Sequence, residues 1–140
     1  MSIDNALEAR PKVSESEKIT INLGFVDLGQ IDLLVKEGFY SNRTDFIRTA
    51  IRNQLDRHGD AVSKSVARYR FELGLRHFSR SDLEAVQAAG ERLHVQVLGL
   101  ARIGDDVPVE LALATIASIQ VLGALHLRPE LRAALKDRIR

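Results

Sequence analysis

The sequence predicts an α+β protein with two folded parts. Residues 17–59 hold one alternating strand pattern followed by two helical patterns, and residues 68–140 hold three similar strand-helix segments at an even spacing. The remaining polar segments are expected to be a disordered N-terminal arm over residues 1–16 and a linker over residues 60–67. With 140 residues and 45% apolar content, the chain has room for one ordinary domain or two small ones.

The first expected element is a short strand over residues 18–23 with two different faces. A lone strand of this kind can neither bury its apolar side nor satisfy its backbone. The simplest partner is the same strand of a second copy, which predicts a homodimer with a two-stranded ribbon. Such a ribbon fits the major groove of double-stranded DNA. The apolar face is Ile19, Ile21 and Leu23, and the polar face is Lys18, Thr20 and Asn22.

Two helices are expected after the strand. Apolar residues at helical spacing predict the first over residues 26–36, and Gly38 supplies its stop. The second begins after Ser41, the expected N-cap, with Asp45 in its first turn, and ends near residues 58–59.

Strand, helix, glycine turn and then SNRTDFIRTAIR resemble the ribbon-helix-helix family of DNA-binding regulators, the Arc, MetJ and CopG type. The likeness covers under a third of the chain, within residues 17–59, and it implies an intertwined homodimer whose antiparallel ribbon enters the major groove. Many members have proline after the strand where this chain has Gly24-Phe25, which leaves the entry into the first helix open. By position, the resemblance gives base reading to Lys18, Thr20 and Asn22, and phosphate binding to Ser41, Asn42, Arg43 and Thr44.

The C-terminal half contains an internal repeat. Its segments start at positions 71, 95 and 119, so the spacing is constant, and the last two share the string QVLG. Each is followed by an acid-leucine pair that opens a helical pattern, with Ser79 or Ser81, Pro108 and Pro129 as start signals. The pattern predicts three parallel strand-helix units, arranged as a leucine-rich-repeat-like stack or a compact α/β domain, and a final helix over residues 129–138.

Charge is unevenly distributed, although the whole chain carries only +1. Residues 64–80 hold five basic side chains and one acid, a net +4. This stretch is suited either to tracking phosphates or to forming the solvated face of a strand.

Several function classes find no support. There is no cysteine, and no nucleophile elbow, phosphate loop or metalloprotease helix, so no catalytic residue, no cofactor and no enzyme activity are expected. His77 and His126 occupy equivalent places in the first and third repeats, with Arg102 in the second. Strands spaced at about 4.8 Å would put these histidines roughly 10 Å apart, too far for one metal ion, and no metal site is expected. The chain has no signal-peptide core or membrane-spanning run, which favours a cytoplasmic protein.

The sequence therefore predicts a homodimeric DNA-binding transcriptional regulator, and a repressor is the preferred interpretation. Its C-terminal domain would bind a partner, an effector or another copy, giving dimers or tetramers. One alternative is the antitoxin of a toxin–antitoxin pair that regulates its own operator through the same module. A second alternative is a self-assembling scaffold in which the C-terminal repeats polymerise.

Overall fold

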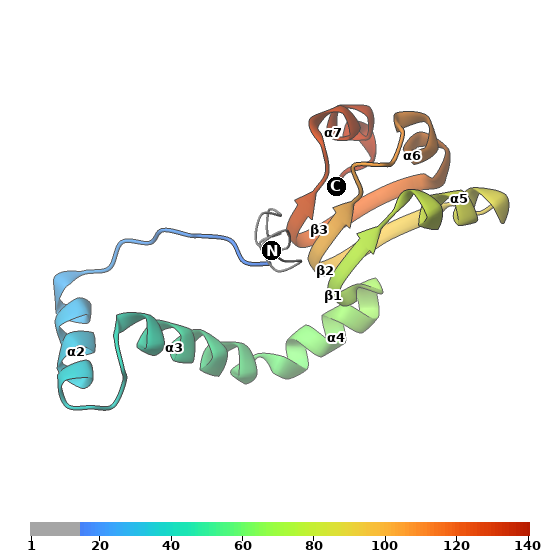
Figure 1. The fold of residues 1–140 in the computed structure, drawn as a ribbon. Helices are drawn as coiled ribbons and strands as arrows, with labels where there is room; N and C mark the ends of the chain where they lie inside the picture. The colour runs from blue at the N-terminus through green and yellow to red at the C-terminus, as the bar shows by residue number, and fades with distance from the viewer. Residues whose placement is uncertain (1–14) are drawn as a thin grey trace, which may run out of the picture. The chain divides into compact units, whose positions relative to one another are not determined.

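The computed structural model describes residues 15–140, and its fold is shown in Figure 1. The expected arm over residues 1–16 therefore lies almost wholly outside the described residues. Two compact units divide the chain, one ending at Asp56 and one spanning Arg57–Arg140. Residues 60–67, which we expected to form a linker, instead lie within helix α4 (Gly59–Tyr69) of the second unit.

The described part of the first unit, from residue 15 onward, contains two helices. Helix α2 (Phe25–Lys36) starts directly after Gly24, and helix α3 (Arg43–Arg57) follows a short turn. Gly38 ends α2 as predicted, with φ of 86°. Its N–H donates to the Val35 carbonyl and that of Phe39 donates to the Leu34 carbonyl, the two bonds of a glycine-terminated helix end.

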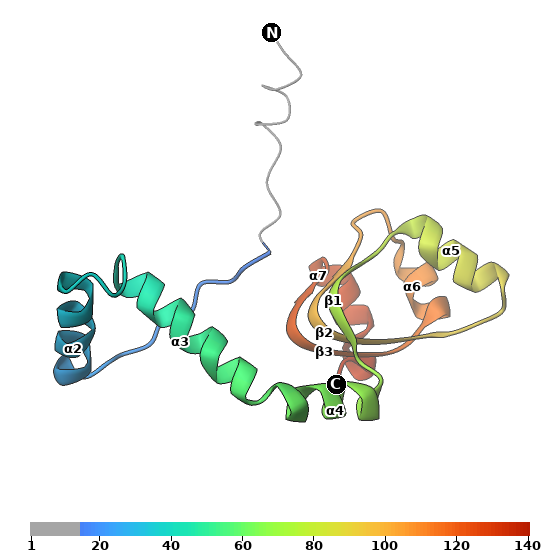
Figure 2. The same ribbon diagram turned by 90° about the horizontal axis from the view of Figure 1, so that it is seen from below.

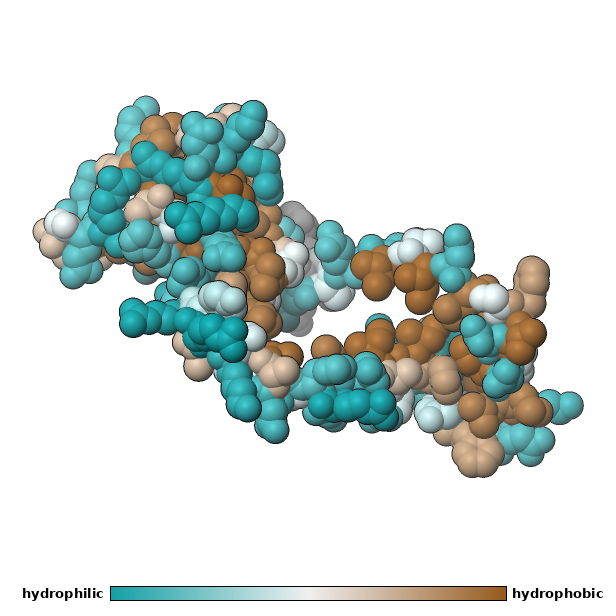
Figure 3. All heavy atoms as spheres, turned by 180° about the vertical axis from the view of Figure 1, so that it is seen from behind, coloured by the Kyte–Doolittle hydropathy of each residue, from teal (hydrophilic) through white to brown (hydrophobic). Residues whose placement is uncertain are grey.

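The first unit buries very little. Ile31 is the buried residue of α2, and α3 has none. Residues 17–24 are extended and pair with no strand among the described residues, so Ile19 and Ile21 are 74% and 61% exposed. Phe25, at the start of α2, is 92% exposed. Figure 3 shows apolar side chains over the surface of this unit. As a single copy, it has more apolar surface than a stable domain of its size leaves in water.

The second unit is a parallel three-stranded sheet in the order β1-β2-β3. Its elements follow α4 along the chain. They are β1 (Glu72–Phe78), α5 (Arg80–Ala88), β2 (Leu93–Ile103), α6 (Val109–Thr115), β3 (Ile116–His126), α7 (Pro129–Ala134) and the 3-10 turn η1 (Lys136–Arg138). Helices α5, α6 and α7 cover one side of the sheet (Figure 2).

The core lies between this side of the sheet and the three helices. Val97 and Ile103 of β2 pack there with Leu83 of α5, Leu111 of α6 and Leu131 of α7. In β2 the inward residues Val95, Val97, Ala101 and Ile103 are buried and most residues between them are partly exposed, as expected for a strand whose two faces differ; Leu100 is the exception and is buried.

A row of glycines crosses the sheet. Gly74, Gly99 and Gly123 pair with one another in register, and all have left-handed φ, at 131°, 140° and 120°. A Cβ added to Gly99 would clash with the Gly74 carbonyl oxygen, and one added to Gly123 would clash with that of Gly99. The strands therefore need glycine in this row, both for backbone conformation and for close approach.

The register corrects the expected repeat spacing at one point. Val95 pairs with Ile119, as the constant spacing predicts. Gly74 pairs with Gly99, however, where that spacing would have placed Leu98, so the first repeat is offset by one position. The predicted equivalence of His77, Arg102 and His126 is confirmed, since these three residues align across the sheet.

Helix ends in this unit differ in detail from the expectations. Ser79, not Ser81, caps α5: its hydroxyl accepts from the Asp82 N–H while the Asp82 carboxylate accepts from the Ser79 N–H. Pro129 is in the first turn of α7 as expected, whereas Pro108 is the residue before α6. The final helix expected over residues 129–138 is split into α7 and η1.

Candidate nucleic-acid interface

The three residues predicted to read bases lie on the extended segment before α2. Lys18, Thr20 and Asn22 are all exposed on the extended segment before α2. Their side chains alternate with Ile19 and Ile21, so pairing that covers the apolar side leaves the polar side outward. An amide, a hydroxyl and an ammonium group are the donors and acceptors that distinguish base edges in the major groove.

The start of α3 shows which residue caps it. Asn42 Oδ1 accepts from the Asp45 N–H at 2.8 Å, so Asn42 is the cap and the expectation of Ser41 was wrong. Ser41 lies one residue earlier, and its N–H donates to Asp45 Oδ2 at 2.9 Å. Both residues offer cap-forming side chains, and the helix begins one residue later than the pattern suggested.

This capping leaves part of the helix end open. Among the described contacts, none occupies the backbone N–H groups of Arg43 and Thr44, which are in the first turn and exposed. Free N–H groups and the partial positive charge of a helix N-terminus favour an anion there. Three of the four predicted phosphate-binding residues thus lie at the cap and first turn of α3, with Ser41 immediately before them.

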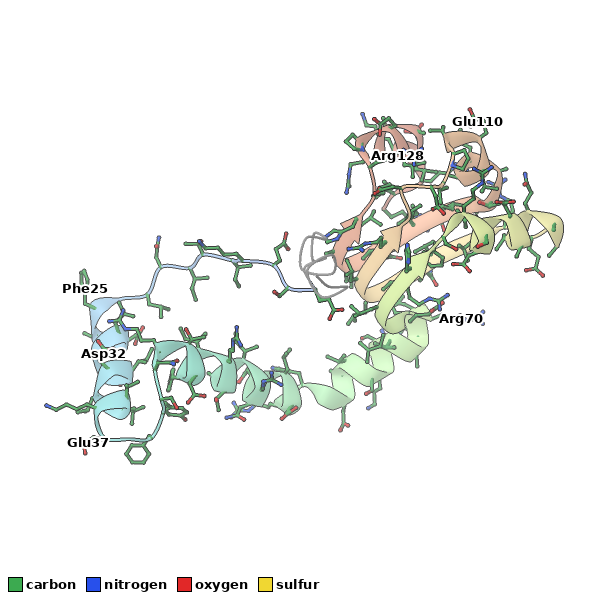
Figure 4. The ribbon with its side chains drawn as sticks, in the orientation of Figure 1. Phe25, Asp32, Glu37, Arg70, Glu110 and Arg128 are labelled. Atoms are coloured by element: carbon green, nitrogen blue, oxygen red, sulfur yellow. The ribbon has the colours of Figure 1, made fainter. Side chains whose placement is uncertain are left out.

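Arg43 also joins the two helices. Its Nε and Nη2 atoms donate to Oδ1 and Oδ2 of Asp32, each at 2.8 Å. Figure 4 shows Asp32 on α2 beside the start of α3. The guanidinium has five N–H donors, so this pair leaves three of them for another acceptor. The sequence did not suggest this pair, because its members are far apart along the chain and a turn lies between them.

The pair changes the acidity of both groups. The hydrogen bonds from Arg43 lower the pKa of Asp32, and the charge of Arg43 adds to this effect. The same bonds raise the pKa of Arg43. The two side chains are 55% and 53% exposed, so solvent screens the attraction and the pair orients Arg43 more than it stabilises the fold.

The extended polar segment, the two helices and the capped start of α3 agree with one family. A sequence profile of the ribbon-helix-helix transcriptional regulator family matches residues 14–132. The chain belongs to this family. The match extends well beyond residues 17–59, which resemble the DNA-binding module, and it includes the sheet and its helices as far as α7.

One relative adds a partial match. An uncharacterized protein of Methanocaldococcus jannaschii is 40% identical over 52 residues, which are 37% of this chain and 52% of that protein. The matched part therefore spans about half the length of the relative. No solved structure matches the ribbon-helix-helix regulator described here.

The second unit of the regulator contains a concave apolar groove between α4 and the sheet. Val62, Val66 and Tyr69 of α4 face Leu98 and Leu122 of the sheet across a groove of about 370 Å³. This groove was not expected from the sequence, although apolar residues recur through α4 at helical spacing.

The described residues 15–140 contain no group of three or more His, Cys, Asp or Glu side chains placed to hold a metal ion. None of their helices is long and apolar enough to cross a membrane. The family is one of transcriptional regulators and not of enzymes.

Proposed function

We propose that this protein is a homodimeric transcriptional repressor that reads operator DNA through a two-stranded ribbon in the major groove. The observation that supports this most strongly is the extended segment before α2, in which the exposed apolar residues Ile19 and Ile21 alternate with three exposed polar side chains. Pairing with a second copy would bury the apolar side chains and present the polar ones.

Each residue group has its own task in this proposal. Lys18, Thr20 and Asn22 contact base edges, where Asn22 can pair bidentately with adenine and Lys18 can donate to guanine. The first turn of α3 holds a flanking phosphate through backbone N–H groups and the Arg43 guanidinium. Phosphate contacts fix the position of the dimer, and base contacts choose the sequence.

The antitoxin alternative uses the same DNA contacts but a different C-terminal half. An antitoxin tail that folds only on its toxin would lack its own core, whereas residues 72–139 here form a sheet with a buried helix layer. We therefore favour a regulator whose second unit is folded before it meets any partner.

The test is selection of bound fragments from genomic DNA by the full chain, followed by sequencing. A paired ribbon is two-fold symmetric, so the enriched sites should be inverted repeats with half-sites at a fixed spacing. A matched selection with Asn22→Ala should recover the same spacing with weaker preference at one position of each half-site. Enrichment of no common sequence by the native chain would overturn the proposal.

A further inference from the structure

The two edges of the sheet differ. At the outer edge of β3 the segment after η1 pairs at one position, where Ile139 forms a parallel bridge with Ile119 and the Arg140 N–H donates to the Ile119 carbonyl at 2.8 Å. Arg138 holds this segment by donating to the carbonyls of Leu113 and Ile116. At the other end, β1 has β2 as its strand neighbour and no other strand beside it in residues 15–140.

Edge strand β1 carries exposed apolar side chains. Leu73 is 70% exposed and Leu75 57%, on the face of the sheet opposite α5, α6 and α7. Their register neighbours on β2 are Leu98 and Leu100, and Leu100 is buried. The apolar row therefore runs off the sheet at its open edge, where another strand would continue it.

Gly74 marks the middle of this edge. It has the same left-handed φ as Gly99 and Gly123, but a Cβ added to it would meet no atom within 4 Å. At the other two positions that space contains the carbonyl of the preceding strand. At Gly99 and Gly123 this conformation makes room for the backbone of the neighbouring strand. Gly74 has the same conformation at the open edge, where no neighbouring strand is present in the single copy.

We propose that two copies of the chain pair through β1 as antiparallel strands related by a two-fold axis at Gly74. In this register Gly74 lies opposite Gly74 of the second copy, and Leu73 lies opposite Leu75 of the second copy. Glu72 then lies opposite Arg76 of the second copy, and the symmetry repeats each contact. Opposite charges and apolar pairs facing each other across two strands stabilise the pairing.

The charges select this register among the neighbouring ones. A two-fold axis perpendicular to a sheet requires a residue to lie opposite itself, because side chains alternate between the faces. Centring on Leu73 would put Arg70 opposite Arg76 and leave Glu72 opposite glycine. Centring on Leu75 would put Glu72 opposite Phe78 and Arg76 opposite glycine. Within one copy Arg76 Nε already contacts Glu72 Oε2 at 2.8 Å, so pairing would alternate four charges along the seam.

The pairing uses the β1 edge of each copy. The outer edge of each β3 is contacted by residues 139 and 140 of its own chain at Ile119. The result is a six-stranded sheet formed by two copies of the second unit. When the two copies belong to one ribbon dimer, the assembly is closed, which opposes the scaffold alternative. When they belong to different ribbon dimers, each dimer keeps a second β1 edge through which the assembly can grow.

The first test is disulfide trapping in the full chain, which has no cysteine of its own. Leu73→Cys and Leu75→Cys chains carrying different tags are coexpressed, oxidised and separated on a denaturing gel. Opposed residues of antiparallel strands have Cα atoms about 4.5–5.5 Å apart, within the range of a disulfide. A mixed dimer linking the two tags is expected. Leu73→Cys alone is the matched control, because its diagonal distance of about 7–8 Å is too long.

The second test reverses the charges in the same trapping assay. Glu72→Arg alone or Arg76→Glu alone places like charges opposite each other at both symmetry-related positions of the seam and should lower the mixed-dimer yield about fivefold or more. Combining Glu72→Arg with Arg76→Glu should restore it. A variant that merely damages the fold would lower the yield without being rescued by the second exchange.

The outcomes decide the proposal without reference to DNA. Absence of the mixed dimer, equal linking by Leu73→Cys alone, or no rescue by the double exchange would each overturn β1 pairing. Operator binding is measured separately on the same variants, so a failure of edge pairing and a failure of DNA recognition are told apart.

Discussion

At the residue scale, Asn22 is the residue whose role is easiest to isolate. Asn22→Ala removes an exposed amide from an extended segment, so the fold should be unaffected. We expect a loss of about 1–3 kcal/mol on the preferred site and a relaxed preference at one base position. Gln30→Ala removes a comparable exposed amide from α2 and serves as the control. Unchanged affinity and specificity in the Asn22 variant would remove this residue from the interface.

Arg43 calls for a paired experiment because it serves two partners in the proposed account. Arg43→Ala removes both the phosphate contact and the bridge to Asp32, whereas Asp32→Asn weakens the bridge and keeps the cation. We expect Arg43→Ala to weaken specific and non-specific DNA alike and to lower the log-affinity versus log-salt slope by about one per contacted phosphate. Asp32→Asn should leave that slope unchanged. Equal slopes for Arg43→Ala and the native chain would show that Arg43 serves only the helix pair.

At the element scale, the capping box of α5 makes stability depend on pH. Hydrogen bonds from Ser79, with the nearby charges of His77 and Arg76, lower the pKa of Asp82. A depressed folded-state pKa contributes stability above the unfolded value near 4, and this contribution is lost as pH falls through the folded-state pKa. Asp82→Asn should therefore show a shallower loss of unfolding free energy below about pH 4. Asp60→Asn on α4 is the control, and matching curves for native and Asp82→Asn chains would contradict the assignment.

The glycine row gives a second prediction at this scale. Gly99→Ala combines a left-handed φ with a Cβ placed against the Gly74 carbonyl, whereas Gly74→Ala has the unfavourable φ and open space. Backbone strain of this kind costs about 1–3 kcal/mol, and the clash adds to it at Gly99 alone. Urea unfolding at a protein concentration too low for β1 pairing should show a much larger loss of unfolding free energy for Gly99→Ala than for Gly74→Ala. Equal losses would mean that conformation, and not strand approach, determines this row.

The elements differ in how far the sequence predicts them. The stop at Gly38 and the alignment of His77 with His126 follow from local signals, and the structure has both. Helix α4 was missed because its polar residues suggested a linker, although Val62, Val66 and Tyr69 recur at helical spacing. A periodicity count over residues 59–69 would have found it.

Other features depend on information that local patterns do not contain. Ser41 and Asn42 are both good caps, and only the exact start of α3 distinguishes them. The pairing of Arg43 with Asp32 depends on how two helices meet across a turn. The offset of one position in the first repeat is set by strand register, which packing of the whole sheet determines.

At the scale of the whole molecule, the two units differ in how much of their apolar surface a single copy buries. The second unit has its own buried core, while the first leaves Ile19, Ile21 and Phe25 exposed in a single copy. Family membership covers both units. In the proposed account a second copy completes the first unit by ribbon pairing and extends the second through β1, so that the regulator is held together at two places.

Base analogues in the selected operator show whether the ribbon reads bases from the major groove. A 7-deazapurine lacks the N7 acceptor of the major groove, whereas inosine in place of guanine lacks only the minor-groove amino group. Affinity of the full chain should fall about tenfold for 7-deazapurine at contacted positions, and should stay within about twofold for inosine. Loss of affinity with inosine and none with 7-deazapurine would contradict the account.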